Sequence, residues 1–262
     1  MTATDPSDGD DERDERDERD ERDERDERDG GRGDHDDGQD DIEERFEALW
    51  CPPERVADPA WAEKRALASA LRELGNLCVT STLGAPELAQ ARRALDDATS
   101  ILRGGPHLSA QAAVADGSFF DDPLRYVDRS AMIGQCNPCA PPLRLAVEGD
   151  RVVGHVTLGA AQVGGPGRAH GGIVATLLDE ALGHAAICRG AGVVTRVLTV
   201  HYDHPTPLYE PLRVEGWLER REGRRYYAGG RVLAGDTATA RAEGLFIRVH
   251  DLRKTHPPHP HD

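Results

Sequence analysis

The sequence predicts an α+β domain in which one antiparallel sheet wraps a single central helix. The helix is expected at residues 170–186, where an apolar run leaves almost no polar face, as in a helix buried on all sides. About six segments with strand character surround it, two before the helix and four after it. This grouping favours an α+β architecture over a parallel α/β sheet, in which strands and helices alternate.

The N-terminal 42 residues differ in composition from the rest of the chain. The triplet Asp-Glu-Arg is repeated six times between Asp11 and Arg28, and residues 1–41 carry 21 acidic residues and seven arginines. They account for −14 of the formal charge of −16 and contain almost no apolar residue. Such a segment cannot bury enough surface to offset its ordering entropy. We predict a disordered acidic tail, and no nucleic-acid partner for the nearly neutral remainder.

Residues 43–105 are rich in Ala, Leu, Arg and Glu, and they predict a helical extension. A first helix is expected to begin at Pro59, after the potential cap Asp58, and to end near Gly75. A second helix should begin around residues 85–87 and end before the glycines and proline of residues 104–106. We expect this extension to pack on the main domain or at a subunit interface.

The strand signals of the main domain, residues 106–250, are separated by turn residues. Segments 143–147 and 152–158 flank Gly149 and Asp150, a typical hairpin turn. After the central helix, alternating or apolar runs predict strands at residues 193–202, 212–218, 226–233 and 239–249. Residues 251–262, rich in His and Pro, are expected to form a disordered tail.

The beginning of the central helix has the composition of an anion-binding site. A glycine-rich loop, residues 164–167, leads to His170, and Gly171 and Gly172 open the helix. The first N–H groups of a helix lack internal partners and lie at the positive end of its dipole. Because glycine leaves these amides unshielded, they suit a carbonyl oxygen that becomes negative during a reaction. The sequence therefore predicts an oxyanion hole.

Two acidic residues, Asp179 and Glu180, interrupt the apolar perimeter of the same helix. A buried carboxylate is costly, so at least one of the pair should be reactive or paired. The alternative is a helix end with a solvated acidic turn. Since successive helical residues point about 100° apart, only one of the two acids can face a given site.

Six segments occur in an order that resembles the hotdog-fold acyl-CoA thioesterases of the PaaI-like group. The run HGGIVATLLDEALG at residues 170–183 carries most of the resemblance, and the spacing from its HGG to its Asp, with a threonine downstream, is fairly specific. The resemblance covers about 130 residues and does not extend to residues 1–105. The other matching segments are residues 137–142, 164–167, 195–202, 205–208 and 242–246.

The resemblance implies a homodimeric hotdog unit, often paired again as a dimer of dimers, that hydrolyses an acyl-CoA thioester. Coenzyme A would be part of the substrate, so no cofactor is expected. Asp179 falls on the carboxylate that acts as nucleophile or general base in this family, and we assign Glu180 a structural role. Gly171, with Gly172 beside it, falls on the helix N-terminal amide that polarises the thioester carbonyl.

Three further site residues follow from the same resemblance. His170 falls on the histidine before the glycines, although it also fits a residue that supports the turn. Thr195 matches a strand hydroxyl that holds the attacking water, although threonine is common in strands. Asn137, in the first matching segment, is expected to contribute to coenzyme A binding.

Two groups predicted for the site are far apart along the helix. Gly171 and Asp179 are separated by eight residues, which corresponds to about 12 Å of helix. One carbonyl carbon cannot contact both. If two such helices run antiparallel across a two-fold axis, the beginning of one meets the middle of the other. We therefore expect a site shared between subunits.

Basic residues are expected near the phosphates of coenzyme A. Arg224 and Arg225, with Arg220 and Arg221, surround a turn and are the best cluster for this role, although charged turns are also common on solvated hairpins. Family members often carry an acidic residue in the loop where this chain has residues 162–165, so an altered acyl preference is expected.

Several functional classes are excluded. The five cysteines are odd in number and scattered, which does not resemble a secreted disulfide framework. Cys136 and Cys139 form a CxxC pair, but no second pair lies at the spacing of a zinc site, so no metal site is predicted. No apolar run approaches the ~18 to 20 residues needed to cross a bilayer, and the N-terminus lacks a signal peptide. We expect a cytoplasmic protein without a membrane partner.

Two alternatives to a thioesterase remain. One is a non-catalytic module that binds acyl-CoA, but the retained Asp179 argues against it. The other is a hydratase or dehydratase of enoyl thioesters, which needs an Asp and a His within one motif. Asn137 and Pro138 supply neither of them.

Overall fold

The computed structural model describes residues 59–107, 127–141, 143–189 and 191–251. The predicted acidic tail, residues 1–42, and residues 252–262 lie outside the described residues. Asp251, placed by our prediction in the C-terminal tail, is instead the last residue of a strand.

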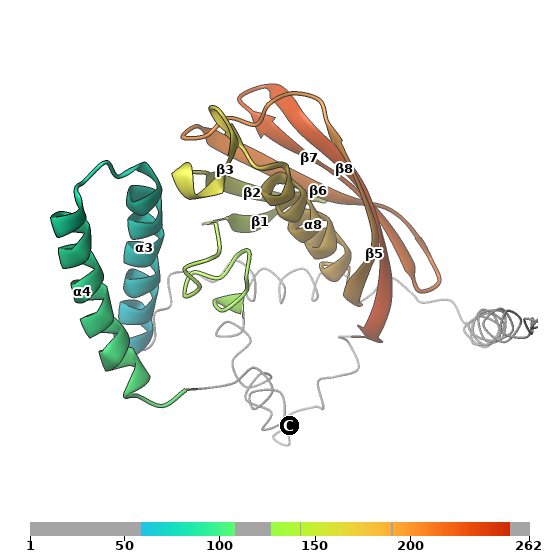
Figure 1. Ribbon diagram of the computed structural model, residues 1–262. Coiled ribbons are helices and arrows are strands. Elements are labelled where there is room, and N and C mark those ends of the chain that lie inside the picture. Colours follow the sequence, from blue (N-terminus) through green and yellow to red (C-terminus); the bar gives the residue numbers. More distant parts are fainter. Residues whose placement is uncertain (1–58, 108–126, 142, 190, 252–262) are drawn as a thin grey trace, which may run out of the picture. The chain divides into compact units, whose positions relative to one another are not determined.

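The main domain contains a six-stranded antiparallel sheet, as predicted (Figure 1). The strands lie in the order β1-β2-β6-β7-β8-β5, so β1 and β5 are the two edges. A shorter ribbon of β3 and β4 follows a 3-10 turn, η1, and precedes the central helix. The elements are β1 Arg144–Glu148, β2 Arg151–Thr157, η1 Ala160–Gln162, β3 Val163–Gly165, β4 Arg168–Ala169, β5 Ala191–Tyr202, β6 Pro211–Glu222, β7 Arg225–Ala234 and β8 Thr237–Asp251.

The central helix α8, Gly171–Ile187, crosses the concave face of this sheet (Figure 1). Small residues of the sheet let it approach closely. A Cβ at Gly216 of β6 would lie 2.4 Å from the Ala181 carbonyl oxygen, and one at Gly230 of β7 would lie 2.2 Å from a methyl of Leu182. The leucines and alanines of α8 that face these strands are fully buried and form the centre of the hydrophobic core.

The expectation that α8 is buried on all sides is wrong for the single chain. The sheet covers one side of the helix, whereas Gly172 is exposed and Thr176, Asp179, Glu180 and Gly183 are only partly covered. These five residues define the open face of α8. They lie roughly on one side of the helix because their spacing follows its turns.

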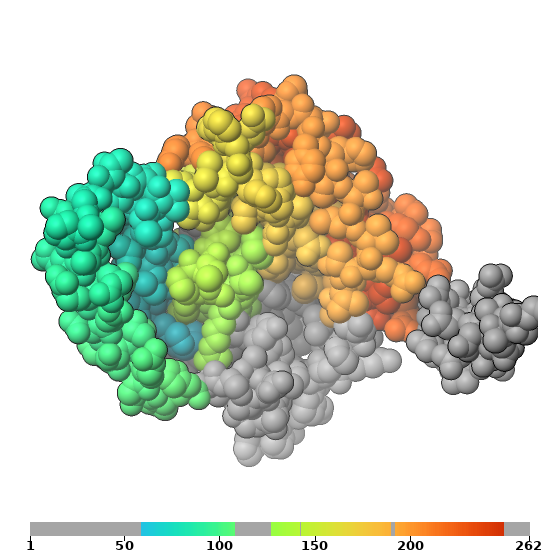
Figure 2. Space-filling model, in the orientation of Figure 1, coloured from blue at the N-terminus to red at the C-terminus, as the bar shows by residue number. Residues whose placement is uncertain are grey.

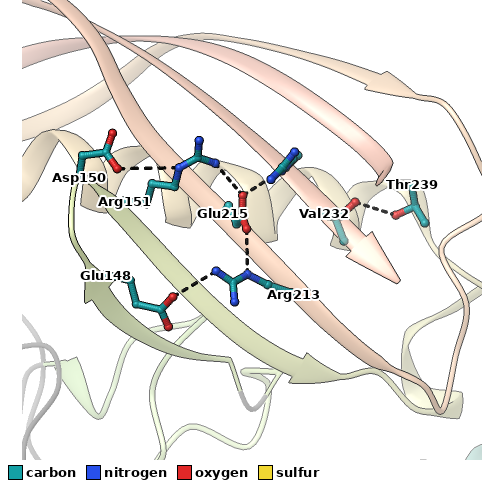
Figure 3. Close-up of polar contacts among 8 residues, drawn as sticks. Glu148, Asp150, Arg151, Arg213, Glu215, Val232 and Thr239 are labelled. Carbon is teal, nitrogen blue, oxygen red and sulfur yellow. Dashed lines mark hydrogen bonds and ion pairs between the residues drawn. The ribbon is translucent and has the colours of Figure 1, made fainter. Parts of the chain in front are cut away.

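Charged side chains link the strands on the outer face of the sheet (Figure 3). The buried carboxylate of Glu215 accepts hydrogen bonds from Arg151, Arg213 and Arg231, at 2.9, 2.8 and 2.8 Å. Arg213 also donates to Glu148 at 3.1 Å. Burial alone would raise the pKa of Glu215, but these hydrogen bonds outweigh it and the pKa is lowered. The network therefore links β1, β2, β6 and β7 through groups that compensate one buried charge.

The N-terminal extension forms two helices, α3 Pro59–Thr80 and α4 Ala85–Arg103. The bounds of α4 agree with the prediction, but α3 does not end near Gly75. The helix continues for five residues beyond Gly75. An interior glycine destabilises a helix by about 1 kcal/mol, and stabilising tertiary contacts of the residues that follow offset this cost. One such contact is made by Asn76, whose Oδ1 accepts a hydrogen bond from the Ala161 N–H at 2.9 Å.

Polar contacts fasten α3 to residues 127–141. The buried carboxylate of Asp128 accepts hydrogen bonds from Trp61 Nε1 at 2.7 Å and Arg65 Nε at 2.6 Å. Two turns further on, Arg72 donates to the carbonyl oxygen of Asn137 at 2.9 Å. Since Asn76 also reaches η1, the extension is attached to the segment that leads to α8.

The close approach of α8 to the sheet can be tested at Gly216. We expect Gly216→Ala to destabilise the fold by about 1–3 kcal/mol, because the added methyl meets the backbone of α8 and forces it away. Chemical denaturation measures the effect. Gly75→Ala is the control, because a Cβ there meets nothing within 4 Å and should stabilise helix α3 by about 0.5–1 kcal/mol. Equal effects of the two changes would contradict close packing at Gly216.

Candidate active site

The hydrogen bonds at the beginning of α8 leave one amide available. His170 is the N-cap, and its Nδ1 accepts a hydrogen bond from the Gly172 N–H at 3.0 Å. Its carbonyl oxygen accepts from Ile173 and Val174, at 2.9 and 3.2 Å. Among the hydrogen bonds of the described residues, none uses the N–H of Gly171. A free donor therefore lies at the positive end of the helix, as an oxyanion hole requires.

His170 is held by the turn that precedes it. Its N–H donates to the Gln162 carbonyl oxygen at 2.9 Å, and the Gln162 side chain in turn accepts from the Gly159 N–H at 2.9 Å. A Cβ at Gly164 would lie only 2.5 Å from the His170 Cα, so a larger residue there would displace the cap. Gly167 turns the β3-β4 ribbon with a φ of +68°, which favours glycine. The glycine-rich loop thus fixes the position of His170.

Asp179 and Thr195 lie together although they are 16 residues apart. The Thr195 hydroxyl donates a hydrogen bond to Asp179 Oδ1 at 2.9 Å. Asp179 belongs to the open face of α8, and Thr195 lies on the edge strand β5, where it pairs with Phe246 of β8. A carboxylate and a hydroxyl with this geometry can hold and activate one water molecule.

Tyr202 is a site residue that the sequence interpretation missed. Its hydroxyl donates a hydrogen bond to the Gly171 carbonyl oxygen at 2.9 Å. Thr195 and Tyr202 are seven residues apart, so in a regular strand they would point to opposite faces. A β-bulge between Thr195 and Val197 inserts Arg196 and shifts the register, so both side chains reach α8. The sequence gives no clear signal of such a bulge.

The neighbouring acid, Glu180, has a different environment from Asp179. Burial raises the pKa of Glu180 to about 7, and the charge of Asp179 adds to this increase. Burial lowers the pKa of His184 to about 4, and its Nδ1 donates to the Glu180 carbonyl oxygen at 2.7 Å. The imidazole is therefore neutral at physiological pH, and a large fraction of Glu180 is protonated. Asp179 is the acid of the pair that contacts Thr195.

Asn137 has both ends of its side chain occupied within its own segment. Its Nδ2 donates to the Arg129 carbonyl oxygen at 3.2 Å, and its Oδ1 accepts from the Cys139 N–H at 2.9 Å. The side chain of Asn137 therefore stabilises the conformation of residues 127–141. Its contact with coenzyme A stays a prediction.

Arg224 and Arg225 lie at the same end of the sheet as Thr195. Arg225 pairs with Ile247 of β8, one position along the strand from the Phe246 that pairs with Thr195. Arg224 donates to the backbone carbonyl oxygen of Arg248 at 3.4 Å. Because neighbouring strand positions alternate in direction, Arg225 belongs to the face opposite Thr195. The role of both arginines in binding phosphate stays a prediction.

The fold and this site define a hotdog-fold protein with a helix N-terminal amide and a carboxylate on one central helix. A family model described as the thioesterase superfamily matches residues 166–240. The chain is also 30% identical to a solved thioesterase superfamily protein, with a TM-score of 0.59, and the alignment covers 70% of this chain and 89% of that one. The chain belongs to the thioesterase superfamily.

Two further relatives are the acyl-coenzyme A thioesterases THEM4 of Bos taurus and Xenopus laevis. They are 36% and 34% identical to this chain over 88 residues, which is 33% of this chain in both cases. The match spans only 36% and 40% of the length of those proteins. Within the described ranges, no helix is both long and apolar enough to cross a membrane.

The acid and the histidine on α8 predict opposing pH effects on stability. Glu180 loses its proton near pH 4.5 when unfolded and near 7 when folded, so its contribution, up to about 3 kcal/mol, is lost as the pH rises through this window. His184 has the opposite sign, because its contribution is lost as the pH falls from 6.5 towards 4.

We therefore expect Glu180→Gln to increase stability at pH 8 and to make the loss below pH 6.5 steeper, because only the His184 effect remains. Denaturation curves between pH 4 and 8 measure both effects. Glu63→Gln, at an exposed glutamate of α3, is the control and should leave the pH profile unchanged. Parallel profiles for wild type and Glu180→Gln would exclude the proposed burial of this acid.

Proposed function

We propose that this protein hydrolyses an acyl-CoA thioester to a free acid and coenzyme A. The observation that carries the proposal is the hydrogen bond of 2.9 Å from Thr195 to Asp179 on the open face of α8. It joins a carboxylate to a hydroxyl on a helix whose first amide, that of Gly171, is available to an oxyanion. The THEM4 relatives are named as acyl-coenzyme A thioesterases, which supports this substrate class.

The proposed enzyme is a homodimer, because one chain supplies an incomplete site. Gly171 and Asp179 lie about 12 Å apart along α8, so they cannot contact the same carbonyl group. Within the described residues β5 pairs only with β8, and Val194 and Val197 are each 50% exposed on it. A second copy placed antiparallel along β5 and the open face of α8 would cover this surface. It would also bring Gly171 of one protomer to Asp179 of the other.

The chemistry follows from these groups. The thioester oxygen accepts a hydrogen bond from the Gly171 N–H, which stabilises the negative charge that develops on it. Asp179 either removes a proton from the attacking water or attacks the carbonyl carbon to form an anhydride that water then hydrolyses. In both routes the C–S bond breaks, one water is consumed, the acyl group leaves as the free acid and coenzyme A leaves as the thiol; in the anhydride route, water that attacks the Asp179 carboxyl carbon leaves its oxygen on Asp179. Single-turnover hydrolysis in ¹⁸O-labelled water distinguishes them, because only the second can label Asp179.

Neighbouring residues keep these groups in place. Thr195 orients the carboxylate of Asp179, and its oxygen can accept a hydrogen bond from the attacking water. Tyr202 and His170 hold the first turn of α8 by binding the Gly171 carbonyl oxygen and the Gly172 N–H. Because the raised pKa of Glu180 leaves a large fraction of it protonated near neutral pH, it repels the developing oxyanion less than an ordinary glutamate would.

The carboxylate and the amide can be removed separately. We expect Asp179→Asn to lower kcat at least ~10²-fold with little change in fold, a loss typical of an essential base or nucleophile. Gly171→Pro should cost about 10²–10³-fold in kcat, because proline lacks the N–H that binds the oxyanion. Proline suits the first position of a helix, and His170 already has the φ of −66° and ψ of 133° that a residue before proline prefers.

Gly171→Ala is the matched control, because it keeps the N–H and its Cβ meets Tyr202 at an ordinary 3.5 Å. It should retain most of the activity. Steady-state hydrolysis of a series of acyl-CoA chain lengths, with release of the free thiol as the readout, measures all three variants. Tight binding of acyl-CoA without turnover by the wild type would instead indicate a non-catalytic binding module.

The shared site predicts complementation between two inactive variants. When Asp179→Asn and Gly171→Pro chains are unfolded together and refolded, half of the dimers are mixed, and each mixed dimer contains one intact site. We expect about a quarter of the wild-type activity to return, as two-fold symmetry requires. Refolding either variant alone is the control. If the mixture stays as inactive as its components, both groups of one site come from the same chain.

A further inference from the structure

Helix α3 faces the main domain with a row of side chains that form hydrogen bonds. The row consists of Trp61, Arg65, Arg72 and Asn76. Their spacings of four, seven and four residues place them on one side of the helix. Ala68, which is 2% exposed, lies on the same side. The first three members of the row bind residues 127–141, and Asn76 extends the row to η1.

The short turn η1 begins at a residue that cannot cap it. Gly159 is its N-cap and has no side chain, whereas an N-cap side chain normally accepts a hydrogen bond from the second or third N–H of the turn. Asn76 Oδ1 accepts this bond instead, from the N–H of the second residue, Ala161, at 2.9 Å. An asparagine of another helix therefore performs the part of the N-cap residue.

Gly159 leaves the space that the Asn76 amide fills. A Cβ at Gly159 would lie 2.4 Å from Asn76 Oδ1 and 2.9 Å from Asn76 Nδ2. The φ of −111° and ψ of −166° at Gly159 are extended values that other residues also adopt, so the backbone conformation does not require glycine. The close approach of Asn76 does require it. Figure 2 shows the end of α3 (teal) against the segment that contains η1 (yellow).

The capped turn carries the residue that holds His170. The N–H of Gln162 donates to the Gly159 carbonyl oxygen at 3.1 Å, and its side chain accepts from the Gly159 N–H at 2.9 Å. The Gln162 carbonyl oxygen accepts from the His170 N–H at 2.9 Å. His170 then binds the Gly172 N–H with its side chain at 3.0 Å. A continuous series of hydrogen bonds therefore connects α3 with the first turn of α8.

We propose that Asn76 is a positioning residue for the oxyanion hole, because its amide caps η1 and so fixes the His170 cap, which leaves the Gly171 N–H to the substrate. This inference rests on the proposed function, in which the Gly171 amide binds the oxyanion. A misplacement of about 1 Å in a group that stabilises the transition state can cost ~10²-fold in rate. Loss of the Asn76 contact should therefore lower kcat and leave KM nearly unchanged.

The first test removes the capping amide. We expect Asn76→Ala to lower kcat about 10-fold and to change KM by less than about two-fold, in steady-state hydrolysis of acyl-CoA. Thr80→Val is the matched control, because it removes the hydrogen bond of 3.0 Å to the Asn76 backbone carbonyl oxygen and leaves the amide in place. It should keep the wild-type kcat. An unchanged kcat in Asn76→Ala, or an equal loss in Thr80→Val, would overturn the proposal.

The second test moves the cap from α3 to η1. Gly159→Asn alone places a side chain in the space of the Asn76 amide, and we expect it to lower kcat. The double variant Asn76→Ala/Gly159→Asn has that space free and carries an asparagine at the N-cap itself, so kcat should return to within about three-fold of wild type. A merely structural contact of α3 predicts no such recovery, because the double variant still lacks it. A double variant no faster than Asn76→Ala would contradict the capping role.

The third test asks whether Asn76 acts through the Gly171 amide. In the Gly171→Pro background this N–H is absent, so adding Asn76→Ala should cause little further loss of kcat. Two residues that act independently would instead give losses that multiply. Multiplied losses would show that Asn76 acts on another part of the site, and the proposal would be wrong.

The position of the cap can also be measured without hydrolysis. We expect amide hydrogen exchange of residues 159–174 to be several-fold faster in Asn76→Ala, near wild type in Asn76→Ala/Gly159→Asn, and unchanged in β6 and β7 in both. This pattern supports the positioning role even if the wild type hydrolyses no acyl-CoA, in which case only the proposed function fails. Unchanged exchange in residues 159–174 would overturn the positioning role in an active enzyme, and so would equal acceleration throughout the sheet.

Discussion

The hydrogen-bonding capacity of the first turn of α8 is the constraint on which the candidate site depends. A helix begins with N–H groups that have no partner inside the helix, and each must find one elsewhere or remain available. His170 occupies the Gly172 N–H with its side chain and two further amides with its carbonyl oxygen. Among the hydrogen bonds of the described residues none uses the Gly171 N–H, so this amide remains available. A capping residue of this kind therefore stabilises the helix and selects the donor that meets the substrate.

The second group of the site depends on an irregularity of the edge strand. Strict alternation along β5 would turn either Thr195 or Tyr202 away from α8. The bulge at Arg196 removes this conflict, so one strand positions the hydroxyl beside Asp179 and also supports the Gly171 backbone. Because β5 is an edge strand, it can accommodate the bulge without breaking a ladder on its other side. Among the described residues this edge is unpaired, and it is where the proposed second copy would bind.

The sequence predicts those features that depend on local patterns. The apolar run, the turn residues and the glycines identify the six strands, the central helix and its N-terminal amides, and the thioesterase family is confirmed. Features that depend on tertiary contacts are not predicted. Gly75 indicates a helix end, but α3 continues past it and Asn76 makes a tertiary hydrogen bond there. No local signal marks the bulge of β5. None marks the high pKa of Glu180 either, because it arises from burial next to Asp179. Whether Asn137 and the arginines of the β6-β7 turn bind substrate depends on a ligand and remains a prediction.

The N-terminal extension belongs to the architecture of the site although it lies outside the matched family segment, residues 166–240. Asn76 of α3 binds the backbone of Ala161, and the next residue, Gln162, accepts the hydrogen bond from the His170 N–H. His170 in turn caps α8. These contacts run without interruption from α3 through η1 to the amides that would bind the oxyanion. A displacement of α3 would therefore be transmitted through η1 to the donor groups at the beginning of α8.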